Sequence, residues 1–220
     1  MKPILIIDFD STFIQDETLD EIANLVADDN QKKEIKNITN QAMEGKIDFG
    51  QALRKRVEML KIHKNDIDNI IKILEKRISL SFVKNKNKLR SISERIYIVS
   101  GGFKEIIIPI VSDYGISKSN VYANEFIYDD KDYITGINAK SPMSFSDGKI
   151  RALKEINFTT DTFVIGDGST DLEMKNVNGI RAFICFTENI VRKSVSEKAD
   201  YVASNLDEVF QIIEASTFHA

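Results

Sequence analysis

The sequence predicts an α/β fold, with a doubly wound, mostly parallel sheet and helices on both of its faces. Its 220 residues are enough for one domain with an insertion or for two small domains. Short runs of Ile, Val, Leu and Phe recur along the chain, and such runs are typical of strands buried on both faces. Segments with apolar residues at helical spacing follow these runs, which is the alternation expected of a parallel sheet.

The elements of the sheet are expected in the following order. Strand-like runs lie at residues 3–10, 95–100, 162–166 and 181–186. Helical spacing is found at residues 103–114, 149–156, 189–199 and 206–215. Residues 124–139 are expected to form a β-hairpin, because aromatic and aliphatic residues flank an acid-rich turn there.

A long segment after the first strand interrupts this alternation. Residues 15–78 contain no strand-like run, and their apolar side chains recur at helical spacing. We therefore expect a helical-bundle cap domain at 15–78, inserted into a core domain formed by residues 1–14 and 79–220. An insertion at this point lies over the carboxyl end of the sheet, where open α/β sheets bind ligands.

Composition excludes several classes of function. The chain has 30 basic and 34 acidic residues, and this net charge of −4 argues against binding to nucleic acid by general electrostatics. Cys185 is the only cysteine, which excludes an internal disulfide and a cysteine-based zinc site. The apolar run at the N-terminus is too short to cross a membrane and lacks the features of a signal peptide. We expect a cytoplasmic protein that binds no membrane.

Two motifs at strand ends carry groups suited to phosphate chemistry. Asp8 and Asp10 end the first strand, and side chains two residues apart on a strand point to the same side. Ser100, Gly101 and Gly102 place a hydroxyl and small residues before a helix, where free N–H groups bind anions. Each motif alone also fits an ordinary strand end or a tight turn.

Two further motifs add a lysine and a second pair of acids. Lys149 stands near a helix start, against the helix dipole, where neutralising an anion is one role and a solvated surface position is the usual one. Asp167 and Asp171 follow a strand in a glycine-containing loop, and an acid there would repel a dinucleotide pyrophosphate. The acids suit a hard divalent cation instead. Mg²⁺ held by Asp8 and Asp167 would offset the acids and bind a phosphate oxygen.

The order of these motifs resembles the haloacid dehalogenase (HAD) superfamily of phosphohydrolases, and within it the phosphoserine phosphatase family. The matching segments are DFDST (8–12), ETLDE (17–21), AMEGKIDFGQALRKRV (42–57), VSGGF (99–103), VYAN (121–124) and GDGSTDLEM (166–174). They span nearly the whole chain. The resemblance implies a Mg²⁺-dependent phosphomonoesterase that converts O-phospho-L-serine to L-serine and phosphate, the last step of serine biosynthesis.

The resemblance also implies roles for single residues. Asp8 matches the nucleophile that forms a phosphoaspartyl intermediate, and Asp10 matches the general acid/base. Asp8, the main-chain carbonyl of Asp10, and Asp167 match the Mg²⁺ ligands, with Asp171 supporting them. The implied substrate-binding residues are Glu17, Met43, Phe49, Arg56, Ser100, Gly101, Lys149 and Thr170.

For three of these residues an ordinary structural role is the alternative. Arg56 lies at the edge of an apolar stripe, where its planar fork suits a substrate carboxylate. The less favoured alternative is that it extends its charged end to water or pairs with a cap acid. Met43 and Phe49 could serve in helix packing alone.

Two departures from the family pattern leave the substrate open. Thr170 stands where many relatives have asparagine, and Glu125 stands where many have arginine. The alternatives are a phosphotransferase, a phosphatase for another small phosphate ester and, less favoured, a catalytically silent binding module. The expected partner is a small phosphate ester, and the expected state is a monomer or a homodimer.

Overall fold

The computed structural model describes residues 3–43, 46–156, 158 and 160–217, without the side chains of residues 43, 49 and 217. Six parallel strands form the main sheet in the order β3-β2-β1-β6-β7-β8. The strands are β1 (Ile4–Ile7), β2 (Ile96–Phe103), β3 (Val121–Asn124), β6 (Thr162–Gly166), β7 (Ile180–Phe186) and β8 (Tyr201–Ala203). The predicted α/β class with a parallel sheet is confirmed. Strands β3 and β8 were not predicted, because three or four residues are too few to show a period.

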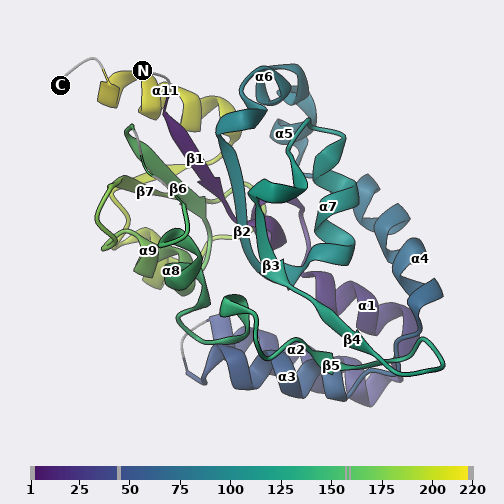
Figure 1. Ribbon diagram of the computed structural model, residues 1–220. Helices are drawn as coiled ribbons and strands as arrows, with labels where there is room; N and C mark the ends of the chain where they lie inside the picture. The colour runs from purple at the N-terminus through teal and green to yellow at the C-terminus, as the bar shows by residue number, and fades with distance from the viewer. Residues whose placement is uncertain (1–2, 44–45, 157, 159, 218–220) are drawn as a thin grey trace.

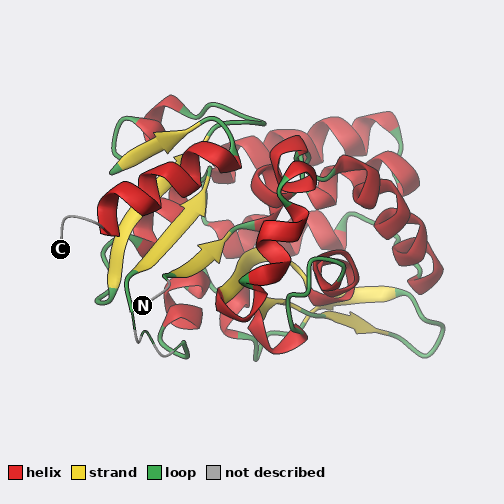
Figure 2. Ribbon diagram, turned by 90° about the horizontal axis from the view of Figure 1, so that it is seen from above, coloured by secondary structure: helices red, strands yellow, loops and turns green. Residues whose placement is uncertain are grey.

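Helices cover both faces of this sheet (Figure 2). Alternation along β1 sends Leu5 and Ile7 to one face and Ile6 to the other. The first face packs against α5 (Leu80–Lys84), α6 (Lys86–Ser91), α7 (Lys104–Ser112) and α11 (Leu206–Thr217). The second face packs against α8 (Gly148–Leu153), α9 (Ser169–Met174) and α10 (Lys193–Ser196). Short helical turns complete the core: η1 (Phe9–Phe13), η2 (Glu75–Arg77), η3 (Ser93–Arg95), η4 (Lys118–Asn120) and η5 (Pro142–Ser144).

The order of the strands reverses beside β1. The chain passes from β1 to β2 and β3 on one side, and then returns to place β6 on the other side of β1. Ligands of open α/β sheets bind in the crevice at such a point, beyond the carboxyl ends of the strands. Asp8 and Asp167 directly follow β1 and β6, so both acids lie at this crevice.

The segment between β1 and β2 contains four longer helices. The first three lie beyond the carboxyl end of the sheet, and the fourth runs beside α7 (Figure 1). They are α1 (Thr18–Val26), α2 (Asp29–Met43), α3 (Phe49–Glu58) and α4 (Lys64–Leu74). The two ends of the segment run side by side, since Ile14 and Ile78 form an antiparallel bridge and Ser79 N donates to Phe13 O at 3.0 Å. The division of the chain into a core and a cap at 15–78 stays a prediction.

The predicted hairpin is confirmed as β4 (Phe126–Tyr128) and β5 (Ile134–Ile137), which pair antiparallel and lie against α3. Asp129 shapes its turn by accepting hydrogen bonds from the N–H groups of Lys131 and Tyr133, each at 2.9 Å. Among the described helices, none combines the length and apolar composition needed to cross a bilayer.

Candidate active site

The turn after β1 holds Asp8 beneath the crevice. Asp8 Oδ1 accepts hydrogen bonds from Phe9 N at 2.8 Å and lies 2.9 Å from Lys149 Nζ. Within the described chain, no hydrogen bond reaches the other carboxylate oxygen, Oδ2. Ser11 in the same turn has φ of 54°, a left-handed conformation that is uncommon outside glycine. Asp8 is therefore fixed through one oxygen, and its second oxygen is available to react.

Lys149 joins Asp8 to a second buried acid. Its Nζ lies 2.6 Å from Asp171 Oδ1, and the lysine side chain is only 8% exposed. Asp171 Oδ2 accepts a hydrogen bond from Gly168 N at 3.0 Å. A Cβ at Gly166 would lie 2.3 Å from Asp171 Cγ, so glycine is required at the end of β6 for this approach. Although burial alone would lower it, the carboxylates of Asp171 and Asp8 raise the pKa of Lys149.

Asp167 completes a group of three acids suited to a metal ion. One oxygen each from Asp8, Asp167 and Asp171 lie within 4.8 Å of one another, and all three residues are buried. Oxygen donors in this number fit a hard divalent cation. Asp167 also accepts hydrogen bonds from Thr12 Oγ1 at 3.2 Å and Arg192 Nε at 2.8 Å. The donor set therefore fits the implied cation, with the Asp10 contribution expected from its main-chain carbonyl.

The acid group is short of positive charge. Burial raises the pKa of Asp8 well above its ordinary value, and Asp171 raises it further while Lys149 opposes the shift. Burial, and then the neighbouring acids Asp171 and Glu17, raise the pKa of Asp167 to about 6. A bound cation would favour the ionised forms of these acids. The electrostatics thus agree with a divalent cation at this place.

Asp10 lies at the border between the sheet and the helical segment. Its Oδ1 accepts hydrogen bonds from Thr18 N at 3.0 Å and from the Thr18 hydroxyl. Burial raises the pKa of Asp10, and the two bonds from Thr18 oppose that rise. A carboxyl group with a raised pKa keeps more of its protonated form near neutral pH, which suits a general acid.

A bulge at the end of β2 brings the predicted phosphate loop next to Asp10. The pairing of β2 with β3 shifts in register between Val99 and Phe103. Gly102 N donates to Ser100 Oγ at 3.0 Å, and Asn124 Nδ2 donates to Gly101 O at 2.9 Å. A Cβ at Gly102 would lie 3.5 Å from Asp10 Oδ2, so the loop and the acid are neighbours.

Glu17 and Arg56 face this loop from the helical segment. Together with Asp10, Gly101 and their neighbours they line a cavity of about 20 Å³. Arg56 is 3% exposed, so the alternative in which its charged end reaches water is wrong. Arg56 donates to Thr39 Oγ1 at 2.9 Å and Ala52 O at 3.3 Å, both uncharged acceptors. The cavity holds about one water molecule, so any larger ligand requires the helices to move.

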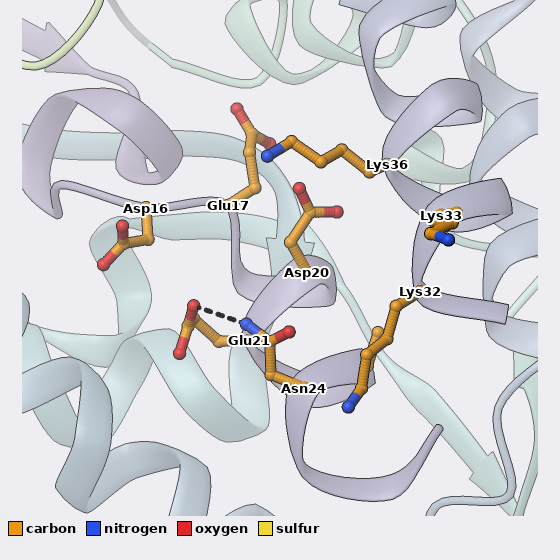
Figure 3. A pocket seen from close by; sticks show the side chains of 9 residues that line it. Asp16, Glu17, Asp20, Glu21, Asn24, Lys32, Lys33 and Lys36 are labelled. Atoms are coloured by element: carbon orange, nitrogen blue, oxygen red, sulfur yellow. Dashed lines mark hydrogen bonds between the residues drawn. The ribbon is translucent and has the colours of Figure 1, made fainter. Parts of the chain in front are cut away.

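Glu17 also borders a larger cavity on its outer side. This cavity measures about 280 Å³ and lies between α1 and α2. Figure 3 shows acidic side chains of α1, including Asp20 and Glu21, on one side and Lys32, Lys33 and Lys36 of α2 on the other. Burial, and then the charge of Asp10, raise the pKa of Glu17 to about 7. Glu17 therefore separates the small inner cavity from a charged outer one.

Acids outnumber cations around the acid group and the inner cavity. The carboxyl groups there are those of Asp8, Asp10, Glu17, Asp20, Asp167 and Asp171, and the cations are Lys149, Arg56 and Arg192. This excess of negative charge agrees with the donor set in favouring a bound cation.

Sequence reasoning missed Arg192. The predicted helix at 189–199 is too long, because α10 begins only at Lys193 and Arg192 precedes it in an extended conformation. The side chain contacts Asp167 and, through Nη2 at 3.4 Å, Glu17. No local pattern signals this role, since one arginine among many basic residues carries no motif and its partners are distant in sequence.

The remaining residues singled out from the sequence are Thr170, Met43, Phe49 and Glu125. Thr170 is half-buried in the first turn of α9. The side chains of Met43 and Phe49 lie outside what the structure describes, so their place in the pocket stays a prediction. Glu125 pairs with Lys104 Nζ at 2.7 Å and with Asn138 Nδ2 at 3.1 Å. Its charge is therefore matched locally.

Comparisons with known proteins agree with this geometry. The family profile of the haloacid dehalogenase-like hydrolases matches residues 5–175. A phosphoserine phosphatase from Methanocaldococcus jannaschii is 31% identical over 215 residues, covering 94% of each chain. A solved phosphoserine phosphohydrolase-like protein from Francisella tularensis is 27% identical, with a TM-score of 0.86 over 96% of this chain and all of that one. A phosphoserine phosphatase solved as a phosphoaspartyl-intermediate analogue is 28% identical, with a TM-score of 0.74 over 96% and 99%.

Proposed function

The chain belongs to the haloacid dehalogenase-like hydrolases, and we propose that it is a phosphoric monoester hydrolase that converts O-phospho-L-serine to L-serine and phosphate. One observation carries the proposal. Asp8, with one oxygen free of hydrogen bonds, lies beside Lys149, and its neighbour Asp10 lines the inner cavity together with the bulge glycines and the buried Arg56. The first set suits a phosphoryl group and the second suits the carboxylate of an amino acid.

The reaction divides into two displacements on Asp8. Asp8 Oδ2 attacks phosphorus and forms the phosphoaspartyl bond, while the bond from phosphorus to the serine oxygen breaks and Asp10 gives that oxygen a proton. Asp10 then removes a proton from water, whose oxygen attacks phosphorus and releases phosphate from Asp8. Splitting the hydrolysis in this way lowers each barrier. The relative solved as a phosphoaspartyl-intermediate analogue supports this route.

Residues around Asp8 stabilise the charge on the phosphoryl oxygens. Lys149 and the donors of the Ser100–Gly102 bulge supply positive charge and hydrogen bonds. Mg²⁺, held by Asp8, Asp167 and the main-chain carbonyl of Asp10 with Asp171 in support, would add the charge of a Lewis acid. Lys149 favours the ionised form of Asp8 and so opposes the rise of the Asp8 pKa that burial causes.

The other side of the inner cavity is proposed to select the amino acid. Glu17 would receive the ammonium group and Arg56 the carboxylate, while Thr170, Met43 and Phe49 stay predicted neighbours. Since the cavity is far smaller than the substrate, the helical segment must open to admit it. A cytoplasmic location, and a monomeric or homodimeric state, stay predictions from the sequence.

The test is release of phosphate from O-phospho-L-serine with Mg²⁺ present. Asp8→Asn should lower kcat by at least about a thousandfold, because an amide cannot form the acyl phosphate. Asp68→Asn is the matched control, since Asp68 is an exposed acid of α4. Near-wild-type turnover in Asp8→Asn would refute the mechanism. A strong preference of the wild type for another small phosphate ester would leave the chemistry intact and replace the substrate.

A further inference from the structure

Arg192 contacts two acids, Asp167 and Glu17, which have different roles in the proposed function. It lies between β7 and α10, and its side chain is 12% exposed. Its Nε is 2.8 Å from Asp167 Oδ2, and its Nη2 is 3.4 Å from Glu17 Oε1. Asp167 belongs to the acid group suited to a metal ion, and Glu17 borders the inner cavity proposed to bind the amino acid. One guanidinium thus spans both halves of the site.

The contacts of Arg192 are part of a closed ring. Ser11 Oγ donates to Glu17 Oε1 at 2.8 Å, and the next residue, Thr12, donates to Asp167 Oδ1 at 3.2 Å. The same two acids therefore accept hydrogen bonds from adjacent residues of the turn after β1. Arg192, which contacts both acids, closes the ring.

Asn189 holds the segment that carries Arg192 onto the same turn. Its Nδ2 lies 3.1 Å from Ser11 O and 3.4 Å from Thr12 O. It also donates to Ser79 Oγ at 2.7 Å, where the helical segment returns to the core. The position of Arg192 is thus set by the fold, and its contacts are not those of a mobile surface arginine.

We propose that Arg192 is a positioning residue that couples the metal site to the amine site, balancing Asp167 and orienting Glu17. This inference rests on the proposed function for the identity of the two sites. A divalent cation and a guanidinium repel each other and compete for the oxygens of Asp167. Arg192 therefore weakens divalent-cation binding. Once a cation takes over the charge of Asp167, the guanidinium remains for Glu17, which it holds toward the substrate ammonium.

Binding of Mg²⁺ alone gives the first test, measured by calorimetry on the substrate-free protein. Arg192→Gln should bind Mg²⁺ about tenfold more tightly than the wild type, because a competing positive charge is removed. Lys193→Gln removes a neighbouring charge that is 87% exposed, so its Mg²⁺ affinity should stay within about twofold of the wild type.

The second measurement compares two substrates. The first is O-phospho-L-serine, and the second is 3-phosphooxypropanoate, which lacks only the amine. The ratio of their kcat/KM values measures how strongly the enzyme prefers a substrate with the ammonium group that Glu17 would bind. Arg192→Gln should lower this ratio at least about fivefold. Arg192→Lys keeps the charge but has a single nitrogen that cannot contact both acids. It should keep the Mg²⁺ affinity of the wild type and also lower the ratio.

The outcomes separate this inference from the proposed function. A wild type that neither binds Mg²⁺ nor hydrolyses O-phospho-L-serine refutes the proposed function. A wild type that does both, with unchanged or weaker Mg²⁺ binding in Arg192→Gln or an unchanged ratio, refutes the coupling alone. Should Arg192→Gln fail to fold by circular dichroism, Arg192→Lys decides: a wild-type ratio overturns the inference, and a lowered ratio with wild-type Mg²⁺ affinity supports it.

Discussion

The phosphate side of the site lies at the ends of β1, β2 and β6, whereas the amino-acid side is formed by α1 and α3 of the helical segment. On the phosphate side the cation is matched, since Lys149 lies 2.6 to 2.9 Å from two carboxylates. On the other side Arg56 is equally buried, but within the described chain it donates only to uncharged oxygens. Glu17, Asp20 and Asp10 attract the Arg56 charge only from beyond ion-pair distance, and burial outweighs them, so the pKa of Arg56 is lowered. The difference indicates a phosphate side whose lysine is already paired before substrate arrives and an amino-acid side whose arginine the substrate would pair.

Removal of Lys149, the cation that is paired with two carboxylates, should have the largest effect on stability and activity. Lys149→Met leaves Asp8 and Asp171 buried without their cation, so the free energy of unfolding should fall by about 3–5 kcal/mol. kcat should fall by about a thousandfold, because the charge on the phosphoryl group is no longer offset. Urea unfolding and phosphate release measure the two effects.

Lys154→Met is the matched control, since Lys154 is an exposed lysine at the C-terminal end of the same helix, α8. Its stability and kcat should stay close to the wild type. A Lys149→Met protein as stable as the control would contradict a matched ion pair on the phosphate side.

Removal of the unmatched cation should have the opposite sign for stability. Arg56→Met should raise the free energy of unfolding by about 1 kcal/mol, because a desolvated charge that no carboxylate contacts is replaced by an apolar side chain. KM for O-phospho-L-serine should rise about a hundredfold, since the substrate carboxylate loses its partner. Phosphoethanolamine lacks that carboxylate, so its KM should change little.

Lys55→Met serves as the control here, because Lys55 is 58% exposed on the same helix. If Arg56→Met were destabilised as strongly as Lys149→Met, the contrast between the two sides would be lost. An equal rise in KM for both substrates would indicate general damage to the helical segment.

The same contrast explains what the sequence could predict. Asp8 and Asp167 directly follow strands, Ser100 lies near the carboxyl end of β2, and Lys149 begins a helix. Parallel strands bring their carboxyl ends to one edge of the sheet. Their convergence therefore follows from local patterns plus one topological rule. No such rule predicts the role of Arg192, because its contact with Glu17 joins residues 175 positions apart along the chain. Likewise, no pattern could reveal that Arg56 makes no ion pair, since that depends on how the helices pack.

Glu17 offers a smaller test through pH. Its ordinary pKa is 4.5, and burial raises it to about 7 in the folded protein. Folding therefore favours the protonated acid, so stability is present below pH 4.5 and is lost as pH rises from 4.5 to 7. Glu17→Gln removes this loss and should be more stable than the wild type at pH 8 by roughly 2–3 kcal/mol, with little difference at pH 4.5. Urea unfolding in the presence of a chelator measures both.

Glu58→Gln, at an exposed position of α3, is the matched control and is measured at the same pH values. A constant difference between Glu17→Gln and the wild type from pH 4.5 to 8 would mean that Glu17 is not held in a desolvated place. Burial of charge on the amino-acid side would then cost less free energy than the contrast between the two sides assumes.

The smallest effect is expected at Thr18, where the two sides meet. Its hydroxyl donates to Asp10, and that bond opposes the rise of the Asp10 pKa. Thr18→Val keeps the main-chain N–H donor at 3.0 Å but removes the hydroxyl, so the pKa of Asp10 should rise further. The pH profile of kcat should move toward alkaline pH by about half a unit, with kcat at pH 7 changing less than about threefold.

Thr18→Ser is the control, because it retains the hydroxyl and should keep the wild-type profile. An unshifted profile in Thr18→Val would show that the Thr18 hydroxyl does not affect the pKa of Asp10. The helical segment would then contribute to substrate selection without changing the pKa of the general acid.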